Sequence, residues 1–141
     1  MLKAQEQSLE TRQTQLFMQY FNFWMSPGYL QNFIEVMNQQ WSDFHDYMEK
    51  YGYRTNPSGF MAYATIENFY GGLGVLVKRG LVDPRIVEDL LDTDIINYRN
   101  KMKPIVEGWR KQFNRPPISE WFEYLYDEMK KREKKLQSSR V

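Results

Sequence analysis

Proline and glycine divide this sequence into separate helical segments, and this punctuation limits the fold more than any other feature. Ser26-Pro27, Asn56-Pro57 and Asp83-Pro84 each place a capping side chain directly before a proline. A Ser, Asn or Asp at the N-cap, followed by Pro at the first helical position, is typical of a helix start. Gly52 and Gly80 follow periodic apolar segments, where glycine commonly ends a helix.

Between these breaks, apolar residues recur every three or four positions, and no segment alternates as a half-buried strand does. We therefore expect an all-α fold, a single-domain bundle of about five to six helices with a long N-terminal helix and a Gly-rich central helix. The segments with the helical pattern are 2–25, 27–51, 57–80, 84–91, 92–113 and 118–135. Ser42 and Asp43 suit a new start within the second segment, and Asp92 or Thr93 suits the start of the fifth. Pro104 predicts a kink or break in the turn before it, because proline lacks an amide donor and crowds that turn.

The composition supports one folded domain. The chain has 141 residues, of which 42% are hydrophobic and 16% aromatic, and disordered chains are poor in such residues. We divide the chain into a polar N-terminal helix extension (1–15), a helical bundle (16–129) and a charged, frayed C-terminal tail (130–141).

The charged and metal-binding residues exclude several function classes. Nineteen Lys and Arg against eighteen Asp and Glu leave a net charge of +1, so there is no strong signal for nucleic acid or an anionic membrane. The chain has no Cys and a single His, His45, which excludes disulfides, thiolate nucleophiles and a His-rich metal site within one chain. We expect no cofactor and no metal, and we assign no catalytic residue.

No run of about 18 apolar residues is present in the sequence, so we expect no transmembrane segment in this chain. We expect a cytoplasmic location, or membrane association if an anchor precedes this chain.

The glycines Gly71, Gly72 and Gly74 lie inside the pattern of the central helix. Each glycine costs a helix about 1 kcal/mol relative to alanine, so some gain must offset them. They do not match a phosphate-binding loop, which lies between a strand and a helix. The simplest explanation is that another helix packs closely against these glycines, and the alternative is that a ligand binds there.

A ligand pocket beside these glycines would be lined by Tyr63, Glu67 and Tyr70, which precede them on the same helix. This arrangement predicts a small-molecule-binding or enzymatic domain, and we keep it as the alternative function.

The function that we favour is a non-enzymatic helical interaction or scaffold module, with an unknown protein or a second copy of the chain as its partner. Leu2, Leu9 and Leu16 are seven residues apart, which is half of the heptad pattern of a coiled coil. This stripe predicts self-association through the N-terminal helix.

A basic cluster near the C-terminus supports a third hypothesis, peripheral contact with a membrane or nucleic acid. It consists of Lys130, Lys131, Arg132, Lys134 and Lys135. Acidic neighbours dilute it, and a solvated last turn explains it more simply.

Several segments resemble a family of prokaryotic helical domains of unknown function, found in bacteria and archaea. They are NFYGGLGVLVKRGLVD (68–83), VEDLL (87–91), KPIV (103–106), WMSP (24–27) and WFEYLY (121–126). The resemblance covers most of the chain and implies no activity. It does imply that many relatives carry an N-terminal transmembrane anchor. Segment 5–19 is similar to the residues directly after that anchor in those relatives, whereas the anchor itself is absent from this sequence.

Overall fold

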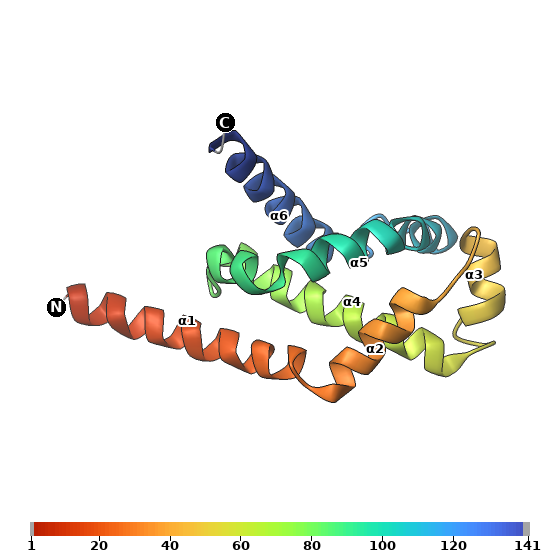
Figure 1. The fold of residues 1–141 in the computed structure, drawn as a ribbon, viewed down its shortest axis with the longest axis horizontal. Helices are drawn as coiled ribbons and strands as arrows, with labels where there is room; N and C mark the ends of the chain where they lie inside the picture. The colour runs from red at the N-terminus through yellow and green to blue at the C-terminus, as the bar shows by residue number, and fades with distance from the viewer. Residues whose placement is uncertain (1, 140–141) are drawn as a thin grey trace.

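Six helices account for the secondary structure of residues 2–139, the part of the chain that the computed structural model describes (Figure 1). They are α1 (Leu2–Trp24), α2 (Pro27–Asn38), α3 (Phe44–Tyr51), α4 (Pro57–Lys78), α5 (Pro84–Phe113) and α6 (Glu120–Ser139). These residues contain no strand, so the expected all-α fold is confirmed. Among the same residues, none of the helices combines the length and apolar content that crossing a bilayer requires.

The three predicted N-caps are present. Ser26, Asn56 and Asp83 each accept a hydrogen bond from a backbone amide two or three residues ahead, at 3.3, 3.0 and 2.9 Å respectively. Gly80 has a φ of 73°, the left-handed conformation expected where α4 ends. Local capping therefore determines where these helices begin and where α4 ends.

Helix α5 corrects one prediction. We expected a new helix at Asp92 or Thr93, but α5 is continuous from Pro84 to Phe113. One buried face runs through this point, because Leu91 and Ile95 are both buried, and a continuous helix keeps them on that face. The predicted break was therefore wrong.

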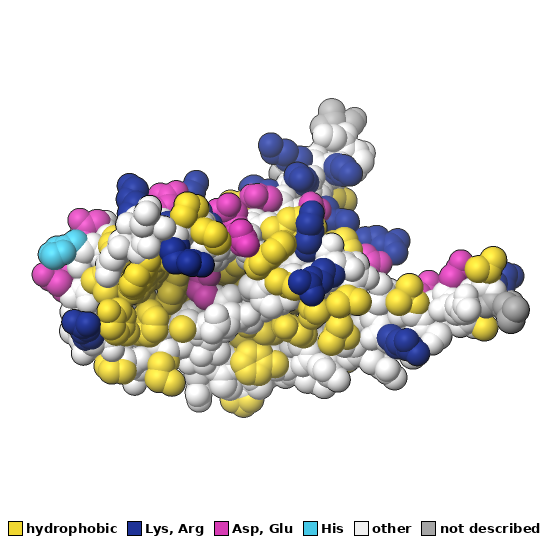
Figure 2. Space-filling view, turned by 180° about the vertical axis from the view of Figure 1, so that it is seen from behind, with side chains coloured by type: hydrophobic (Ala, Val, Ile, Leu, Met, Phe, Trp, Pro, Cys, Tyr) yellow, Lys and Arg dark blue, Asp and Glu magenta, His cyan; other side chains and the backbone are white. Residues whose placement is uncertain are grey.

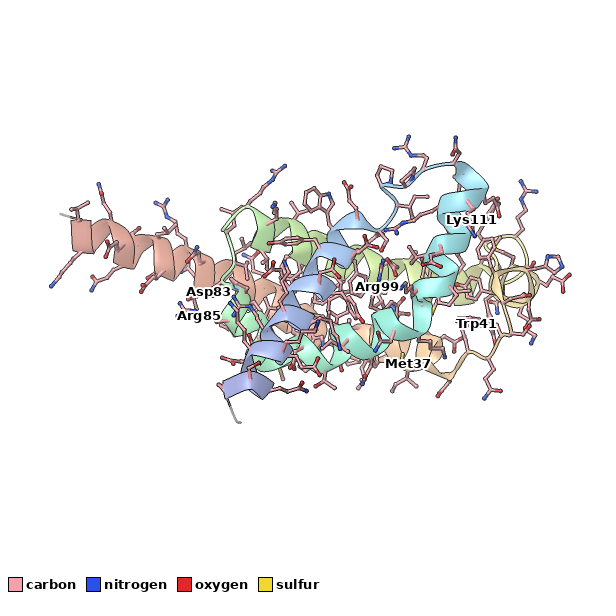
Figure 3. All side chains as sticks on the ribbon, turned by 90° about the horizontal axis from the view of Figure 1, so that it is seen from above. Met37, Trp41, Asp83, Arg85, Arg99 and Lys111 are labelled. Atoms are coloured by element: carbon pink, nitrogen blue, oxygen red, sulfur yellow. The ribbon has the colours of Figure 1, made fainter. Side chains whose placement is uncertain are left out.

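Pro104 lies inside α5 without interrupting it. The helix axis nevertheless turns between the labelled residues Arg99 and Lys111 (Figure 3). A proline inside a helix removes one hydrogen bond and crowds the preceding turn, which accounts for the bend. The bend directs the last turns of α5 toward the end of the molecule that carries α3.

Helix α4 is the centre of the bundle and packs against α2, α3 and α6. Aromatic rings fill much of the core, and three of the buried tyrosines have polar partners within it. The hydroxyls of Tyr29 and Tyr70 lie 2.6 Å apart, and the Tyr98 hydroxyl donates to the Tyr63 carbonyl at 3.2 Å. These bonds join α2 and α5 to α4.

The two terminal helices extend beyond the bundle (Figure 1). The N-terminal half of α1 is exposed, and its C-terminal half packs on the core through Leu16 and Phe17. Helix α6 continues to Ser139, past the end that we expected at Lys135. Met1 of the extension and residues 140–141 of the tail lie outside the described residues.

Candidate functional site

A pocket of about 320 Å³ lies between α4, the last turns of α5 and the loop that joins α5 to α6. It is lined by Tyr53, Phe60, Tyr63, Ala64, Glu67, Asn68, Trp109, Phe113, Ile118 and Ser119. Figure 2 shows that apolar side chains gather at the end of the molecule that carries α3, which the single histidine marks in cyan. The volume is near the lower limit of ligand pockets, which hold about 300–1,000 Å³.

The walls of the pocket are aromatic and centre on Trp109. Its ring stacks on Phe113 with centroids 5.6 Å apart, and it meets Phe60 nearly at right angles at 5.9 Å. Tyr53, from the loop before α4, stacks on Trp109 at 6.2 Å. Trp109 itself is buried, but Phe113 and Tyr53 remain 51% and 38% exposed, so the pocket opens to solvent beside them.

The acidic residue of the pocket is Glu67. Its Oε2 accepts a hydrogen bond of 2.7 Å from the Ser119 hydroxyl, while its Oε1 is buried and has no hydrogen-bond partner. The indole Nε1 of Trp109 is also buried without a partner. Most buried polar atoms in proteins are paired, and these two both belong to the lining residues, whereas other unpartnered buried atoms of the described residues, such as Gln39 Oε1 and the Tyr47 hydroxyl, lie outside the lining.

Two arginines lie behind Glu67 but do not form an ion pair with it. Arg99 donates to the Ser119 hydroxyl at 2.7 Å and to Glu123 Oε2 at 2.9 Å. Arg110 donates to the same Glu123 oxygen at 3.0 Å and to the Ile118 carbonyl at 2.8 Å. Glu123 therefore pairs with both cations, and the Ser119 hydroxyl mediates between Arg99 and Glu67 (Arg99 is labelled in Figure 3).

Burial raises the pKa of Glu67 to about 7, because the site offers little solvation for its negative charge. The hydrogen bond from Ser119 and the charges of Arg99 and Arg110 act in the opposite direction and are outweighed. The side chain as a whole is only partly buried, but the unpartnered Oε1 is inaccessible to solvent. Glu67 therefore titrates near neutral pH.

Ser119 is held in an uncommon backbone conformation, with a φ of 61°. A residue other than glycine in the left-handed region stores on the order of 1–3 kcal/mol of strain. The Ser119 side chain lies between Glu67 and Arg99, so the loop conformation maintains the one hydrogen bond that the Glu67 carboxylate accepts.

The pocket includes two of the residues that the sequence pointed to. Tyr63 and Glu67 line it. Tyr70 does not, because its hydroxyl faces Tyr29 in the core. Sequence reasoning missed Ser119 and Trp109, which no local motif connects to Glu67.

The glycines lie away from this pocket. A Cβ at Gly74 would fall 2.1 Å from the carbonyl oxygen of Trp121, so α6 crosses α4 at that residue. A Cβ at Gly72 would lie 2.7 Å from the Tyr20 hydroxyl of α1, whereas Gly71 has no neighbour within 4 Å. The Gly-rich turns of α4 therefore contact helices at two positions and are open at the third.

The other residues chosen from sequence lie apart from the pocket. Leu2 and Leu9 are 76% and 54% exposed on α1. In the basic cluster, Arg132 pairs with Glu88 of α5 at 3.1 Å, and Lys130 and Lys131 each pair with a glutamate of α6. Across residues 2–139, no three His, Asp or Glu side chains come together as metal ligands.

The chemistry that this geometry supports is binding. Arg99 donates to the Ser119 oxygen, which makes that oxygen a poorer nucleophile, while Glu67 retains one oxygen able to accept a hydrogen bond. Aromatic walls with a few polar groups are typical of small-molecule sites.

Comparison with known proteins yields one match. The sequence model of a family described as a domain of unknown function (DUF4760) matches residues 3–129. The matched region includes the whole pocket and the arginine–glutamate cluster behind it. No curated protein and no solved structure matches significantly.

Proposed function

Because the chain belongs to the DUF4760 family of domains of unknown function, we propose its role from geometry: it is a helical domain that binds a small molecule in the pocket beside Glu67. The observation that carries this proposal is the buried, unpartnered Oε1 of a carboxylate in an aromatic pocket. A carboxyl group with a pKa displaced by burial, placed in a cleft, is typical of functional sites.

Energetics support the same role. An unsatisfied buried polar atom costs about 1–3 kcal/mol, and the left-handed Ser119 adds strain that supports the same carboxylate. Glu123 alone pairs with both arginines. A cluster with only a structural role would therefore require neither the unpaired oxygen of Glu67 nor the strained backbone of Ser119. A ligand with a positive charge or a hydrogen-bond donor beside Glu67 would offset part of the cost of burying its carboxylate.

A fragment screen by ¹H–¹⁵N NMR tests the proposal, with the indole resonance of Trp109 as the reporter. Ala64 lines the pocket, so Ala64→Leu should fill it and abolish binding. Ala4→Leu makes the same change on the exposed half of α1 and should leave binding intact. A screen in which no fragment shifts Trp109, or in which Ala64→Leu binds as well as the wild type, would contradict the proposal.

A second role, protein interaction, is favoured by α1. Residues 2–12 of this helix are exposed. Isolated helices of this length are marginal in water, so association stabilises them. We propose that Leu2 and Leu9, with the partly buried Leu16, pair with the same stripe of a second copy in a non-enzymatic, scaffold-like assembly.

Light scattering on the full chain tests this second role. The wild type should dimerise, and Leu9→Lys should be monomeric, because a charge replaces an apolar contact in the stripe. Gln7→Lys adds the same charge on another side of the helix and should still dimerise. A wild type that stays monomeric at high micromolar concentration would refute the assembly.

Four expectations from the sequence remain predictions: a prokaryotic origin, relatives with a membrane anchor, a cytoplasmic location, and contact with the phosphates of a membrane or nucleic acid through the basic cluster at residues 130–135.

A further inference from the structure

We infer that the Glu67 pocket is selective for a small organic cation, an alkylammonium group whose charge lies beside Glu67 and whose carbon atoms contact the aromatic walls. This inference deepens the proposed ligand-binding function and rests on it.

The residues that line the pocket carry one acid and no base. Glu67 is the only one of them with a charged form near neutral pH; the others are aromatic, aliphatic or neutral polar residues. An anionic ligand would therefore meet a carboxylate and no cationic side chain. A cation would lie beside the one side chain of the lining that can carry a negative charge.

The nearby arginines are already engaged. Arg99 and Arg110 pair with Glu123 and with oxygens of residues 118 and 119. Arg54 lies outside the lining residues, with its guanidinium carbon 5.6 Å from the centre of the Tyr53 ring. None of these cations lines the pocket, so none offers an anion a direct contact there.

The walls suit a cation. The faces of aromatic rings carry a negative potential, and a cation within about 6 Å of a ring centre gains roughly 0.5–2 kcal/mol. The Arg54–Tyr53 contact shows that a ring at the rim already attracts a cation. The rings that a ligand can reach are the exposed Phe113 and Tyr53, which stack on the buried Trp109.

Binding of a cation should depend on pH through Glu67. A cation stabilises the ionised carboxylate, so its affinity should fall as pH drops below the pKa of Glu67, which is about 7. The tyrosines that face Glu67 stay neutral in this range, because burial raises the pKa of Tyr47, Tyr63 and Tyr98. Glu67 is therefore the group of this site whose charge changes between pH 6 and pH 8.

The test uses three probes of one shape: cyclohexylammonium, cyclohexanol and cyclohexanecarboxylate. NMR titrations of the full chain at pH 8 should give at least a tenfold lower Kd for the ammonium than for the alcohol, and the weakest binding for the carboxylate. Lowering the pH from 8 to 6 should raise the Kd of the ammonium severalfold and leave that of the alcohol unchanged.

Two variants test whether Glu67 causes the preference for the ammonium over the alcohol. Glu67→Gln should abolish the advantage of the ammonium, whereas Glu35→Gln, the same change on the exposed face of α2, should keep it. If Glu67→Gln fails to fold, Phe113→Leu replaces a half-exposed ring of the wall and should weaken the ammonium more than the alcohol.

The outcomes separate the two proposals. Equal binding of all three probes, tightest binding of the carboxylate, or an ammonium preference that survives Glu67→Gln would overturn the cation inference and leave a ligand pocket. Absence of binding by every probe, together with a negative fragment screen, would overturn the proposed function as well.

Discussion

Replacing single glycines of α4 with alanine tests the packing of the bundle quantitatively. Gly71 and Gly74 lie within one turn of the same helix, so alanine brings each the same gain in helix propensity, about 1 kcal/mol. Their surroundings differ. The added Cβ at Gly71 meets nothing within 4 Å, whereas at Gly74 it falls 2.1 Å from the backbone oxygen of Trp121.

The geometry sets the expected magnitudes. Gly71→Ala should raise the free energy of unfolding by about 0.4–1 kcal/mol, because nothing opposes the propensity gain. Gly74→Ala forces the backbone of α6 away from α4, and a clash with backbone belongs at the upper end of the usual cost of overpacking, about 1–3 kcal/mol. The propensity gain of about 1 kcal/mol offsets part of that cost, so a net loss of about 2 kcal/mol remains.

Urea denaturation and thermal melting measure the difference. The two variants should differ by at least about 2–3 kcal/mol, or roughly 8 °C in Tm for a domain of this size. Gly72→Ala should fall between them, because its Cβ meets only the movable end of the Tyr20 side chain. Equal stability of Gly71→Ala and Gly74→Ala would refute the close crossing of α4 and α6.

Two further predictions concern Glu67 and Glu123, the two acids beside Arg99 and Arg110. The pKa of Glu67 is about 7 in the folded protein against the ordinary 4.5. As pH rises, Glu67 loses its proton first in the unfolded state, so the free energy of unfolding falls between pH 4.5 and pH 7. Glu67→Gln should therefore be more stable than the wild type at pH 8, by up to about 3 kcal/mol, and this difference should shrink toward pH 5 in denaturation experiments. Glu123→Gln should lower the free energy of unfolding by about 1–3 kcal/mol, because it removes the charged partner of the buried Arg99 and of Arg110. Glu120→Gln, on an exposed residue of the same helix, should change stability by less than about 0.5 kcal/mol.

Much of the secondary structure could be read from local patterns. The caps at Ser26, Asn56 and Asp83, and the left-handed Gly80, depend on residues within three positions along the chain. Such features act in the same way in most folds, so the all-α class and most helix starts could be predicted from them.

The prediction failed where packing competed with a local signal. Asp92 is a good cap, yet the buried stripe through Leu91 and Ile95 keeps α5 continuous. Burial of these side chains is worth more than one cap, about 1.5–3 kcal/mol each against roughly 1 kcal/mol.

The sequence by itself determined an all-helical chain, the residues that punctuate it and its resemblance to a family of unknown function. It also pointed to Glu67, but beside the glycines, where α1 and α6 pack instead. Only the tertiary structure decided that Ser119, 52 positions further on, donates to Glu67 Oε2 while Oε1 lacks a partner. The pKa of a carboxyl depends on burial and on neighbours brought from distant segments, and those exist only once the helices have packed.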